Sequence, residues 1–467
     1  MASAPIARHS TRRTLFLVIL VAVGVRGWLW LSYRPVSYSD THSYRRLANA
    51  IHNPNWKGYD GTRTPGYPLL LALLGPDRRV YLGQLVMGLA ITLLLFYLGW
   101  QVSDPARPGG KVWLGTAAAL AHTLNLGQLF FEADLLTETP TTFWILLTLA
   151  GVVFWLHHPA RRSVWLACGL GITSTAAALT RPLFIYLPFW ILLFIVIEGR
   201  RLRFNFQTLT RATALLVPVA LLFGVWVNFI HGRFHDWALT TMTGYHLVQH
   251  TGSYFEYVPD KYAALRDTYI KYRDAQIAQH GTQANAIWDA IPEMTRVSGM
   301  TFFDLNRTLA RISTRLILEH PDLYLKSSIE GWWMFWRPPF YWSPEAFRWQ
   351  GMAAVIRPAV FLERLALFGV NLLFIFLSLA AAVLAVLPKR IVPRGEGFAR
   401  LHAIASSLPS SFWCLAGTIW IASILQTMLD HGDNPRFLVP LQSLVVVLVI
   451  WLLSWSSKGL QRIRLVE

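Results

Sequence analysis

Long apolar runs separated by short polar connections are the feature that most constrains the fold of this chain. Several runs reach the roughly 20 residues that a helix needs to cross a bilayer, and 54% of all residues are hydrophobic while only 14% are charged. We expect an all-α polytopic membrane protein with about 10 transmembrane helices, in a range of roughly 10 to 12. Residues 69–76 are too short to cross and are expected to dip into the interface. The predicted spans are 14–33, 80–100, 112–131, 139–156, 163–179, 183–197, 212–230, 359–387, 404–428 and 437–456.

The first apolar run resembles a signal peptide in one respect. Its apolar part, residues 14–25, is short, and the basic stretch RHSTRR precedes it. No A-x-A-like cleavage site follows, however, and the WLWL of residues 28–31 extends the run. We therefore expect an uncleaved first span.

The net charge of +17 is better explained by membrane topology than by nucleic acid, and no nucleic-acid partner is expected. Lys and Arg gather in short segments that all fall on one side when the ten spans are threaded. By the positive-inside rule that side is the cytoplasm, which also holds both termini. The basic segments are 8–13, 107–111, 161–162, 200–211, 389–400 and 458–464.

The first outer connection, residues 34–79, departs from that rule and invites a functional explanation. Its apolar residues from Tyr44 to Ile51 recur at helical spacing, which predicts a short helix in the membrane interface with Asp40 at its N-terminus. A segment rich in Gly, Asn and Pro follows this helix. Arg63 then begins the stretch RTPGYP, which leads into the apolar sequence LLLALL. One acid and one cation thus flank the same patch.

A second long connection, residues 231–358, is rich in Tyr, His, Trp and charge and also falls outside. Helical periodicity in 260–281 and 304–336 predicts a helical outer-face domain, between membrane modules at 1–230 and 359–467. The aromatic cluster at 332–342 fits either an aromatic belt or a platform for sugar stacking. First-turn or N-cap acids are expected at Asp260, Asp304 and Asp322.

The two cysteines, Cys168 and Cys414, both lie inside predicted spans. They are expected to be small core residues and not a disulfide or a metal site.

Several ionisable residues stand at the outer ends of predicted spans. Such groups are costly at a membrane boundary unless they are solvated or paired, so their convergence predicts a cavity open to the outer leaflet. The alternative is that each one caps a helix or snorkels. Besides Asp40 and Arg63, the set contains Glu132, Asp134, Glu138, Arg181, Asp430, His431, Asp433 and Arg436.

The order and sidedness of these motifs resemble the integral-membrane GT-C glycosyltransferases. The likeness covers most of the membrane part and is closest to the bacterial relatives of protein O-mannosyltransferases (family 39) and of aminoarabinose transferases. The chain departs from the latter in ending on the cytoplasmic side, without a C-terminal outer domain. The motifs are the first-loop Asp with its interfacial helix, RTPGYPLLL, LLTET, LTRP and PRFLVP.

The resemblance implies an enzyme that moves a sugar from a polyprenyl-phosphate carrier to an acceptor on the outer face. By position it makes Asp40 the catalytic first-loop acid and Glu138 the acid that enters the fourth span. It places Arg63, Arg181 and Arg436 near the donor phosphate. Further candidates for substrate binding are Tyr67, Asp134 and His250.

The chemistry is consistent with these residue types. A positioned carboxylate can accept the proton of an acceptor hydroxyl, whereas a phosphate leaving group needs only cations, for which the Arg fork is suited. Direct displacement inverts the anomeric centre. No cofactor is expected, although a divalent cation on Asp40 and Glu138 stays open, and no nucleotide-binding Gly-rich loop is present.

We therefore predict an inverting glycosyltransferase of EC class 2.4 in the bacterial inner membrane, with its active site facing the periplasm. The expected partners are membrane lipids, a polyprenyl-phosphate-linked sugar, and a glycan, lipid or protein acceptor. The rival is a transporter or flippase of a lipid-linked sugar, which would show inverted repeats and charges near the midplane. An accessory scaffold would leave the acids and arginines unexplained.

Overall fold

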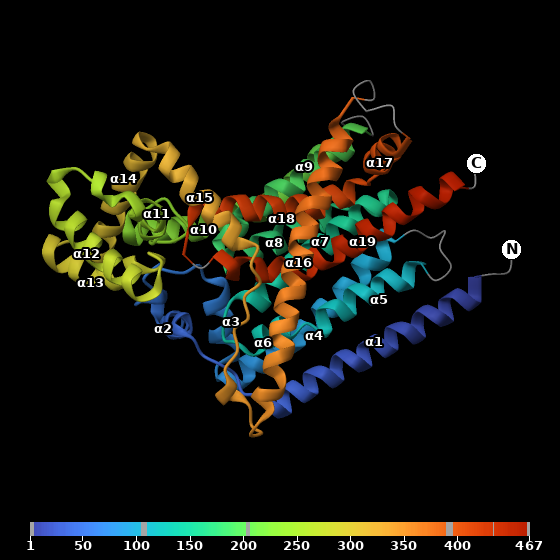
Figure 1. Cartoon of the computed structure of the whole chain (residues 1–467), viewed down its shortest axis with the longest axis horizontal. Helices are drawn as coiled ribbons and strands as arrows, with labels where there is room; N and C mark the ends of the chain where they lie inside the picture. The colour runs from blue at the N-terminus through green and yellow to red at the C-terminus, as the bar shows by residue number, and fades with distance from the viewer. Residues whose placement is uncertain (1–3, 104–109, 202–205, 389–395, 433, 465–467) are drawn as a thin grey trace.

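The structure is a computed structural model that describes residues 4–103, 110–201, 206–388, 396–432 and 434–464. These residues form nineteen α-helices joined by short turns and contain no β-strand, only the isolated bridges Tyr33–Phe347 and Val36–Asp134 (Figure 1). The all-α, polytopic architecture predicted from the sequence is therefore confirmed. Parts of the predicted basic segments, among them Arg107, Arg203 and Lys389, lie outside the described residues.

Eight helical stretches among the described residues are long and apolar enough to cross a membrane. Each corresponds to one of the predicted spans. Two of them combine a 3-10 turn with an α-helix, at Pro182–Tyr186 before α9 and at Asn434–Leu438 before α19. The helices concerned are α1 (Ala4–Ser32), α4 (Asp77–Val102), α7 (Glu138–His157), α9 (Leu187–Arg201), α10 (Phe206–Phe234), α16 (Met352–Val386), α18 (Ser410–Leu429) and α19 (Val439–Arg464).

The other two predicted spans are shorter or broken. Span 163–179 is α8 (Val164–Thr180), an apolar helix of 17 residues. Span 112–131 is divided into α5 (Gly110–Thr123) and α6 (Leu126–Ala133). The break follows from Asn125, whose side chain accepts a hydrogen bond from the Gln128 amide at 2.8 Å and so starts a new helix.

The predicted span 404–428 also begins later than expected. Helix α17 (Glu396–Ser406) ends before Pro409, and α18 starts after it. A proline disfavours helical geometry in the residue before it and cannot donate a backbone hydrogen bond, so it separates the two helices.

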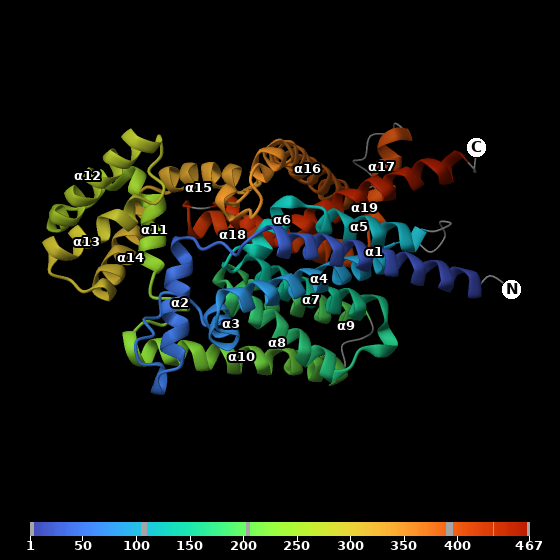
Figure 2. The ribbon, with the colours of Figure 1, turned by 90° about the horizontal axis from the view of Figure 1, so that it is seen from below.

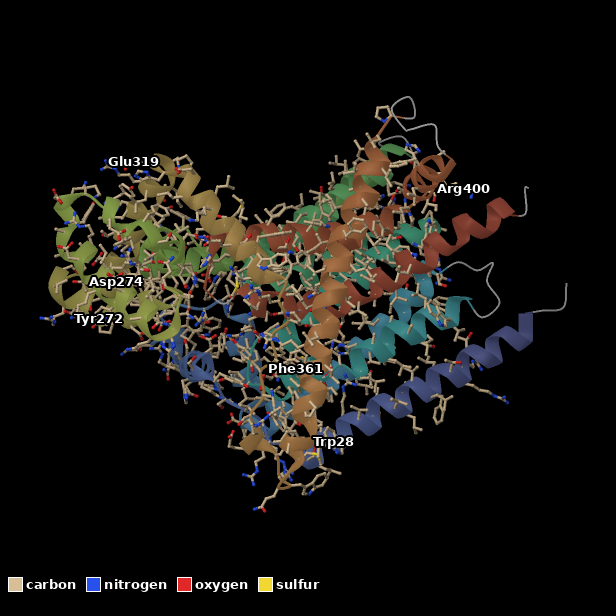
Figure 3. All side chains as sticks on the ribbon, in the orientation of Figure 1. Trp28, Tyr272, Asp274, Glu319, Phe361 and Arg400 are labelled. Carbon is tan, nitrogen blue, oxygen red and sulfur yellow. The ribbon has the colours of Figure 1, made fainter. Side chains whose placement is uncertain are left out.

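Both termini lie at one end of the molecule, and the helices of the long connection lie at the other (Figures 1 and 2). Arg400 lies toward the end with the termini, whereas Asp274 and Glu319 lie toward the opposite end (Figure 3). The two segments predicted to face outward therefore share one end of the helical bundle. One surrounds α2 (Ser39–Ile51), and the other runs from α11 (Thr243–Thr251) to α14 (Phe302–Glu319).

The predicted interfacial helix is present as α2 (Ser39–Ile51), with Asp40 in its first turn. Its buried face includes Tyr44, Leu47 and Ala48, as the helical spacing indicates. The short helix α3 (Gly66–Leu74) follows. A Cβ atom on Gly66 would lie 2.6 Å from the Leu179 carbonyl oxygen, so this glycine lets the RTPGYP stretch approach the end of α8.

The connection 231–358 contains five helices with a hydrophobic core of their own, built around Tyr245, Phe255, Tyr269 and Leu309. The predicted helical stretch 304–336 is two helices, because Pro321 occupies the first turn of the second. The acids at Asp260, Asp304 and Asp322 stand in first turns, as expected. The helices are α11 (Thr243–Thr251), α12 (Ala263–His280), α13 (Ala286–Ser298), α14 (Phe302–Glu319) and α15 (Pro321–Phe335).

Candidate active site

The connection between α1 and α4 is hydrogen-bonded to the segment that precedes α7. The Val36 amide donates to the Ala133 carbonyl at 3.1 Å, and the Leu135 amide donates back to the Val36 carbonyl at 2.9 Å. At the start of α2 the Thr41 hydroxyl donates to the Leu135 carbonyl at 3.0 Å. These bonds bring the first turn of α2, with Asp40, beside the start of α7, where Glu138 stands.

Five of the predicted site residues meet in one ion-pair network at this place. Arg63 Nη2 donates to Asp40 Oδ1 at 2.6 Å, and Arg436 Nη1 donates to Asp40 Oδ2 at 2.7 Å. Arg436 also donates through Nε to Glu138. Arg181 Nη2 donates to the same carboxylate of Glu138 at 3.0 Å and its Nη1 contacts the Arg436 carbonyl at 3.4 Å. The acids and arginines come from widely separated parts of the chain.

The network has an open end and a closed end. The side chains of Asp40 and Arg63 are each 26% exposed. Glu138 is 0% exposed, and Arg181 and Arg436 are 8% and 9% exposed. A ligand arriving from solvent or from the bilayer surface would therefore meet Asp40 and Arg63 first.

The charge of Asp40 is fixed by its neighbours. Burial alone would raise the pKa of this carboxyl, but the guanidiniums of Arg63 and Arg436 outweigh burial and lower the pKa to about 2. Asp40 is thus ionised at neutral pH, and it is a weak proton acceptor while both arginines hold it.

Asp134 lies four residues before Glu138 in the sequence, but its surroundings differ from those of Asp40 and Glu138. It is fully buried, and neither carboxylate oxygen has a hydrogen-bond partner among the described residues. Burial, and after it the negative charge of Glu138, raise the pKa of Asp134 well above its usual range. Asp134 is thus placed near the network without sharing its ion pairs.

Tyr67 is also buried and supports the site from within. Its hydroxyl donates to Gln84 Oε1 at 3.0 Å, and its ring meets that of Tyr44 edge-on at 5.1 Å. Gln84 in turn donates to the carbonyl oxygens of Glu132 and Asp134, at 3.0 and 2.7 Å. Gln84 was not among the predicted residues, because a lone glutamine in an apolar run gives no signal of its partners.

His250 belongs to a different cluster. Its Nδ1 lies 2.9 Å from the Ser327 hydroxyl, and its ring is 5.5 Å from that of His431. Burial, and after it the neighbouring His431, lower the pKa of His250 to about 4. No hydrogen bond or ion pair in the described part of the chain joins His250 to the Asp40 network.

Three aromatic rings complete the surroundings of the arginines, and the nearest is Phe437, whose ring centre lies 4.2 Å from the Arg181 guanidinium. The Arg63 guanidinium lies 5.5 Å from the Tyr44 ring centre, and that of Arg436 lies 5.8 Å from the Tyr341 ring centre. Tyr341 comes from the predicted aromatic cluster at 332–342. Another member, Trp336, is fully buried and packs against Phe374 and Trp420 in the bundle core, so it forms neither a belt nor a sugar platform.

The other ionisable residues predicted at the outer ends of spans have other partners. Glu132 forms a buried ion pair with Arg26 of α1, at 2.6 Å. Asp430 accepts from His246 at 3.0 Å, and Asp433 lies outside the described residues. Among the residues that the structure describes, no group of three or more His, Cys, Asp or Glu side chains could hold a metal ion. Asp40 and Glu138 contact guanidiniums at this site.

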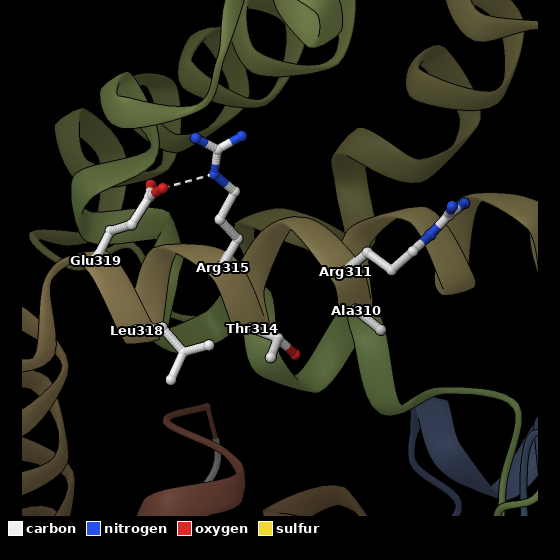
Figure 4. Close-up of a pocket in the computed structure, with 6 residues that line it drawn as sticks. All are labelled: Ala310, Arg311, Thr314, Arg315, Leu318 and Glu319. Carbon is white, nitrogen blue, oxygen red and sulfur yellow. Dashed lines mark hydrogen bonds and ion pairs between the residues drawn. The ribbon is translucent and has the colours of Figure 1, made fainter.

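An open hollow of about 500 Å³ lies elsewhere, along α14 (Figure 4). It is lined by residues of that one helix and contains none of the predicted site residues. The lining residues are Ala310, Arg311, Thr314, Arg315, Leu318 and Glu319.

No model of a known protein family matches the sequence, and neither does any curated protein. Solved structures similar to this chain include the archaeal oligosaccharyltransferase AglB from Archaeoglobus fulgidus in complex with an inhibitory peptide and a dolichol-phosphate. The match has 13% identity and a TM-score of 0.49, and it covers 96% of this chain and 51% of that one. The chain thus spans about half the length of AglB.

ArnT from Cupriavidus metallidurans bound to undecaprenyl phosphate is a second similar structure, with 15% identity and a TM-score of 0.32. That match covers 95% of this chain and 77% of that one. Both neighbours are of the GT-C kind that the sequence motifs resemble.

Proposed function

We propose that this protein is a glycosyltransferase that moves a sugar from a polyprenyl-phosphate carrier to an acceptor hydroxyl. The observation that carries the proposal is the convergence of Asp40 and Glu138 with Arg63, Arg181 and Arg436 at one end of a membrane-helix bundle. Acids and arginines gathered there combine a proton acceptor with cations for a phosphate, next to the apolar surface where a lipid carrier resides.

The reaction would proceed by direct displacement. The acceptor oxygen attacks the anomeric carbon and forms the new glycosidic bond, and the bond from that carbon to the phosphate oxygen breaks. Its electron pair leaves with the carrier phosphate, which gains a negative charge, and the proton of the acceptor hydroxyl passes to Asp40. Attack from the side opposite the phosphate inverts the anomeric centre.

Arginine is suited to the leaving group because its planar fork can hold two phosphate oxygens at once. Arg63 stands at the open end of the network and Arg436 links that end to the buried Glu138. In this proposal Glu138 keeps Arg181 and Arg436 oriented, and the role of proton acceptor belongs to Asp40. Arg181 supports the phosphate from the buried side.

The proposal also includes the orientation. The network end, with α2 and the helices of 231–358, faces the periplasm, and the termini face the cytoplasm of a bacterial inner membrane. The modules 1–230 and 359–467 form the membrane part, and the connection between them is an outer-face domain that receives the glycan, lipid or protein acceptor.

The test is a transfer assay with purified protein in detergent, a radiolabelled pool of polyprenyl-phosphate-linked sugars and a crude envelope acceptor fraction. We expect label in the acceptor with wild-type protein and none with Asp40→Asn. The matched control is Asp77→Asn, since Asp77 is a half-exposed carboxylate that pairs with Arg45 outside the network. If neither the wild-type protein nor the Asp77→Asn control consumed the donor, the proposal would be contradicted.

A further inference from the structure

Two roles proposed for the same groups compete in this structure. The carrier phosphate needs Arg63 and Arg436, yet both of these guanidiniums donate to Asp40. The base needs a carboxylate whose charge is not already neutralised, yet Oδ1 and Oδ2 of Asp40 each accept a charged hydrogen bond. Each group weakens the other for its proposed role.

Resting on the proposed function, we propose that the carrier phosphate takes the place of the Asp40 carboxylate on Arg63 and Arg436, so that donor binding itself releases the base. The exchange makes the reaction ordered. A donor must be bound before Asp40 can accept a proton from an acceptor hydroxyl.

Arg63 has an unused donor that favours a phosphate over the carboxylate. Its Nη2 is bonded to Asp40, but its Nε is buried and has no hydrogen-bond partner among the described residues. A buried donor without a partner is costly. A phosphate that spans Nε and Nη2 would satisfy both, as the bidentate geometry of arginine and phosphate allows.

The surroundings would keep Arg63 in place when Asp40 leaves. The guanidinium lies over the Tyr44 ring at 5.5 Å, a contact that does not depend on Asp40. The Tyr44 ring is itself packed edge-on against buried Tyr67. The cation is therefore positioned by an aromatic ring on one side while its anionic partner changes.

Exposure separates the exchangeable acid from the fixed one. Asp40 is 26% exposed and lies at the open end, so its carboxylate can turn toward solvent when it is displaced. Glu138 is 0% exposed and is bonded to both Arg181 and Arg436, so its release would leave a buried charge without a partner. The phosphate is expected to displace Asp40 and leave Glu138 in place.

The released carboxylate is also a better base. While both arginines hold it, the pKa of Asp40 is about 2. Loss of those two contacts moves the pKa back toward the usual aspartate range near 4. Without donor, a water or acceptor hydroxyl at Asp40 would not be activated, which protects the site from idle proton transfer.

Removing the competitor should strengthen phosphate binding even as it abolishes turnover. The probe is undecaprenyl phosphate, titrated onto detergent-purified wild type, Asp40→Asn and Asp40→Ala. We expect both variants to bind it about tenfold more tightly or better, because the two charged hydrogen bonds of Asp40 no longer have to be broken. Asp77→Asn should bind like wild type. Thermal unfolding checks that each variant is folded.

A double variant separates the share of Arg63 from that of Arg436. In an Arg63→Gln background, Asp40→Asn should tighten undecaprenyl phosphate binding by a smaller factor than it does in wild type, because only the Arg436 contact is still under competition. Equal or weaker binding by folded Asp40→Asn and Asp40→Ala would overturn the exchange, because Asp40 would then not compete with the phosphate.

The outcome is separable from the proposed function. If the Asp40 variants bind undecaprenyl phosphate more tightly but the wild type transfers no sugar, the exchange is supported and the transferase activity is contradicted. If the wild type transfers sugar but the variants bind undecaprenyl phosphate as the wild type does, the transferase activity is supported and the exchange is contradicted.

Discussion

Arg436 joins Asp40 and Glu138 through one guanidinium, since Nη1 donates to Asp40 at 2.7 Å and Nε donates to Glu138. The residues are separated by most of the chain, for Arg436 precedes α19 whereas Asp40 opens α2. This contact ties the start of α2 to the segment that leads into α19. Because the two carboxylates share Arg436, Asp40 can lose its ion pairs while Glu138 still pairs with Arg436 and Arg181.

Asp40→Asn tests the base directly. The amide keeps the shape of the side chain but cannot accept the acceptor proton, so the transfer rate should fall by about 10²-fold or more, as for loss of a general base. The measurement is the initial rate of sugar transfer, with Asp77→Asn as the folded control. A variant that remained active would assign the proton to another group, and one that failed to fold would make Asp40 a structural cap.

Glu138→Gln tests the buried end of the network through stability. Glu138 is 0% exposed and pairs with both Arg181 and Arg436. Its loss removes one buried negative charge from two guanidiniums, of which Arg436 still has Asp40. Breaking one partner of such a pair typically costs about 3–5 kcal/mol, and the unfolding temperature in detergent should fall clearly. The control is Glu319→Gln, an exposed partner of Arg315 on α14, which should unfold like wild type. Unchanged stability of Glu138→Gln would show that water or another group takes over the charge.

Arg63→Lys separates charge from geometry. Lysine keeps the positive charge but loses the fork, so undecaprenyl phosphate should bind about tenfold more weakly, with a further loss in turnover as the leaving charge grows. Arg46→Lys is the matched control, since Arg46 is 63% exposed and pairs with Asp60 outside the network. Equal effects of the two substitutions would mean that the phosphate does not contact Arg63 through its fork.

Topology decides whether the network can be an outer-face site. In a background with Cys168 and Cys414 replaced by alanine, single cysteines at the exposed positions Lys57 and Thr282 should react with an impermeant thiol reagent in intact cells. A cysteine at the exposed Ala160, between α7 and α8, should not react. The reverse labelling pattern would place the Asp40 network on the cytoplasmic side.

The sequence could predict elements whose signals are local. Helix α2 follows from the spacing of Tyr44, Leu47 and Ala48 along one face, and Asp40 stands in its first turn because the apolar pattern begins there. Ionisable residues at span ends must find partners or solvent, which is why Asp40 and Arg436 could be grouped before their contact was known.

Partners separated along the chain and the direction of side chains could not be predicted. Nothing near Glu132 indicates that Arg26 in the first span is its partner, so the sequence suggested an outer-face acid where a buried ion pair lies. Tyr67 points inward to Gln84, although its position in RTPGYP also fits a ligand contact. Asn125 is one polar residue in an apolar run, so the sequence predicts a continuous span where its capping hydrogen bond starts a new helix.

The last prediction uses the opposite directions in which the pKa values of Asp134 and Asp40 are shifted. Burial, with the charge of Glu138, raises the pKa of Asp134 in the folded protein, so the folded state binds a proton that the unfolded chain has lost above its usual pKa near 4. Asp134 therefore lowers the free energy of unfolding as pH rises through that value toward neutrality. Asp134→Asn should remove this penalty and raise the unfolding temperature at pH 7, with no gain at pH 3.5.

Asp40 has the reverse sign and is the internal control. Its folded pKa of about 2 lies below the unfolded value, so its contribution to stability is complete above about pH 4 and is lost as pH falls toward 2. Asp40→Asn should therefore lower the unfolding temperature at pH 7, where Asp134→Asn raises it. The measurement is thermal unfolding of both variants in detergent at pH 3.5 and pH 7. Destabilisation by Asp134→Asn at pH 7 would mean that Asp134 is ionised and paired, and that it belongs to the network with Arg436.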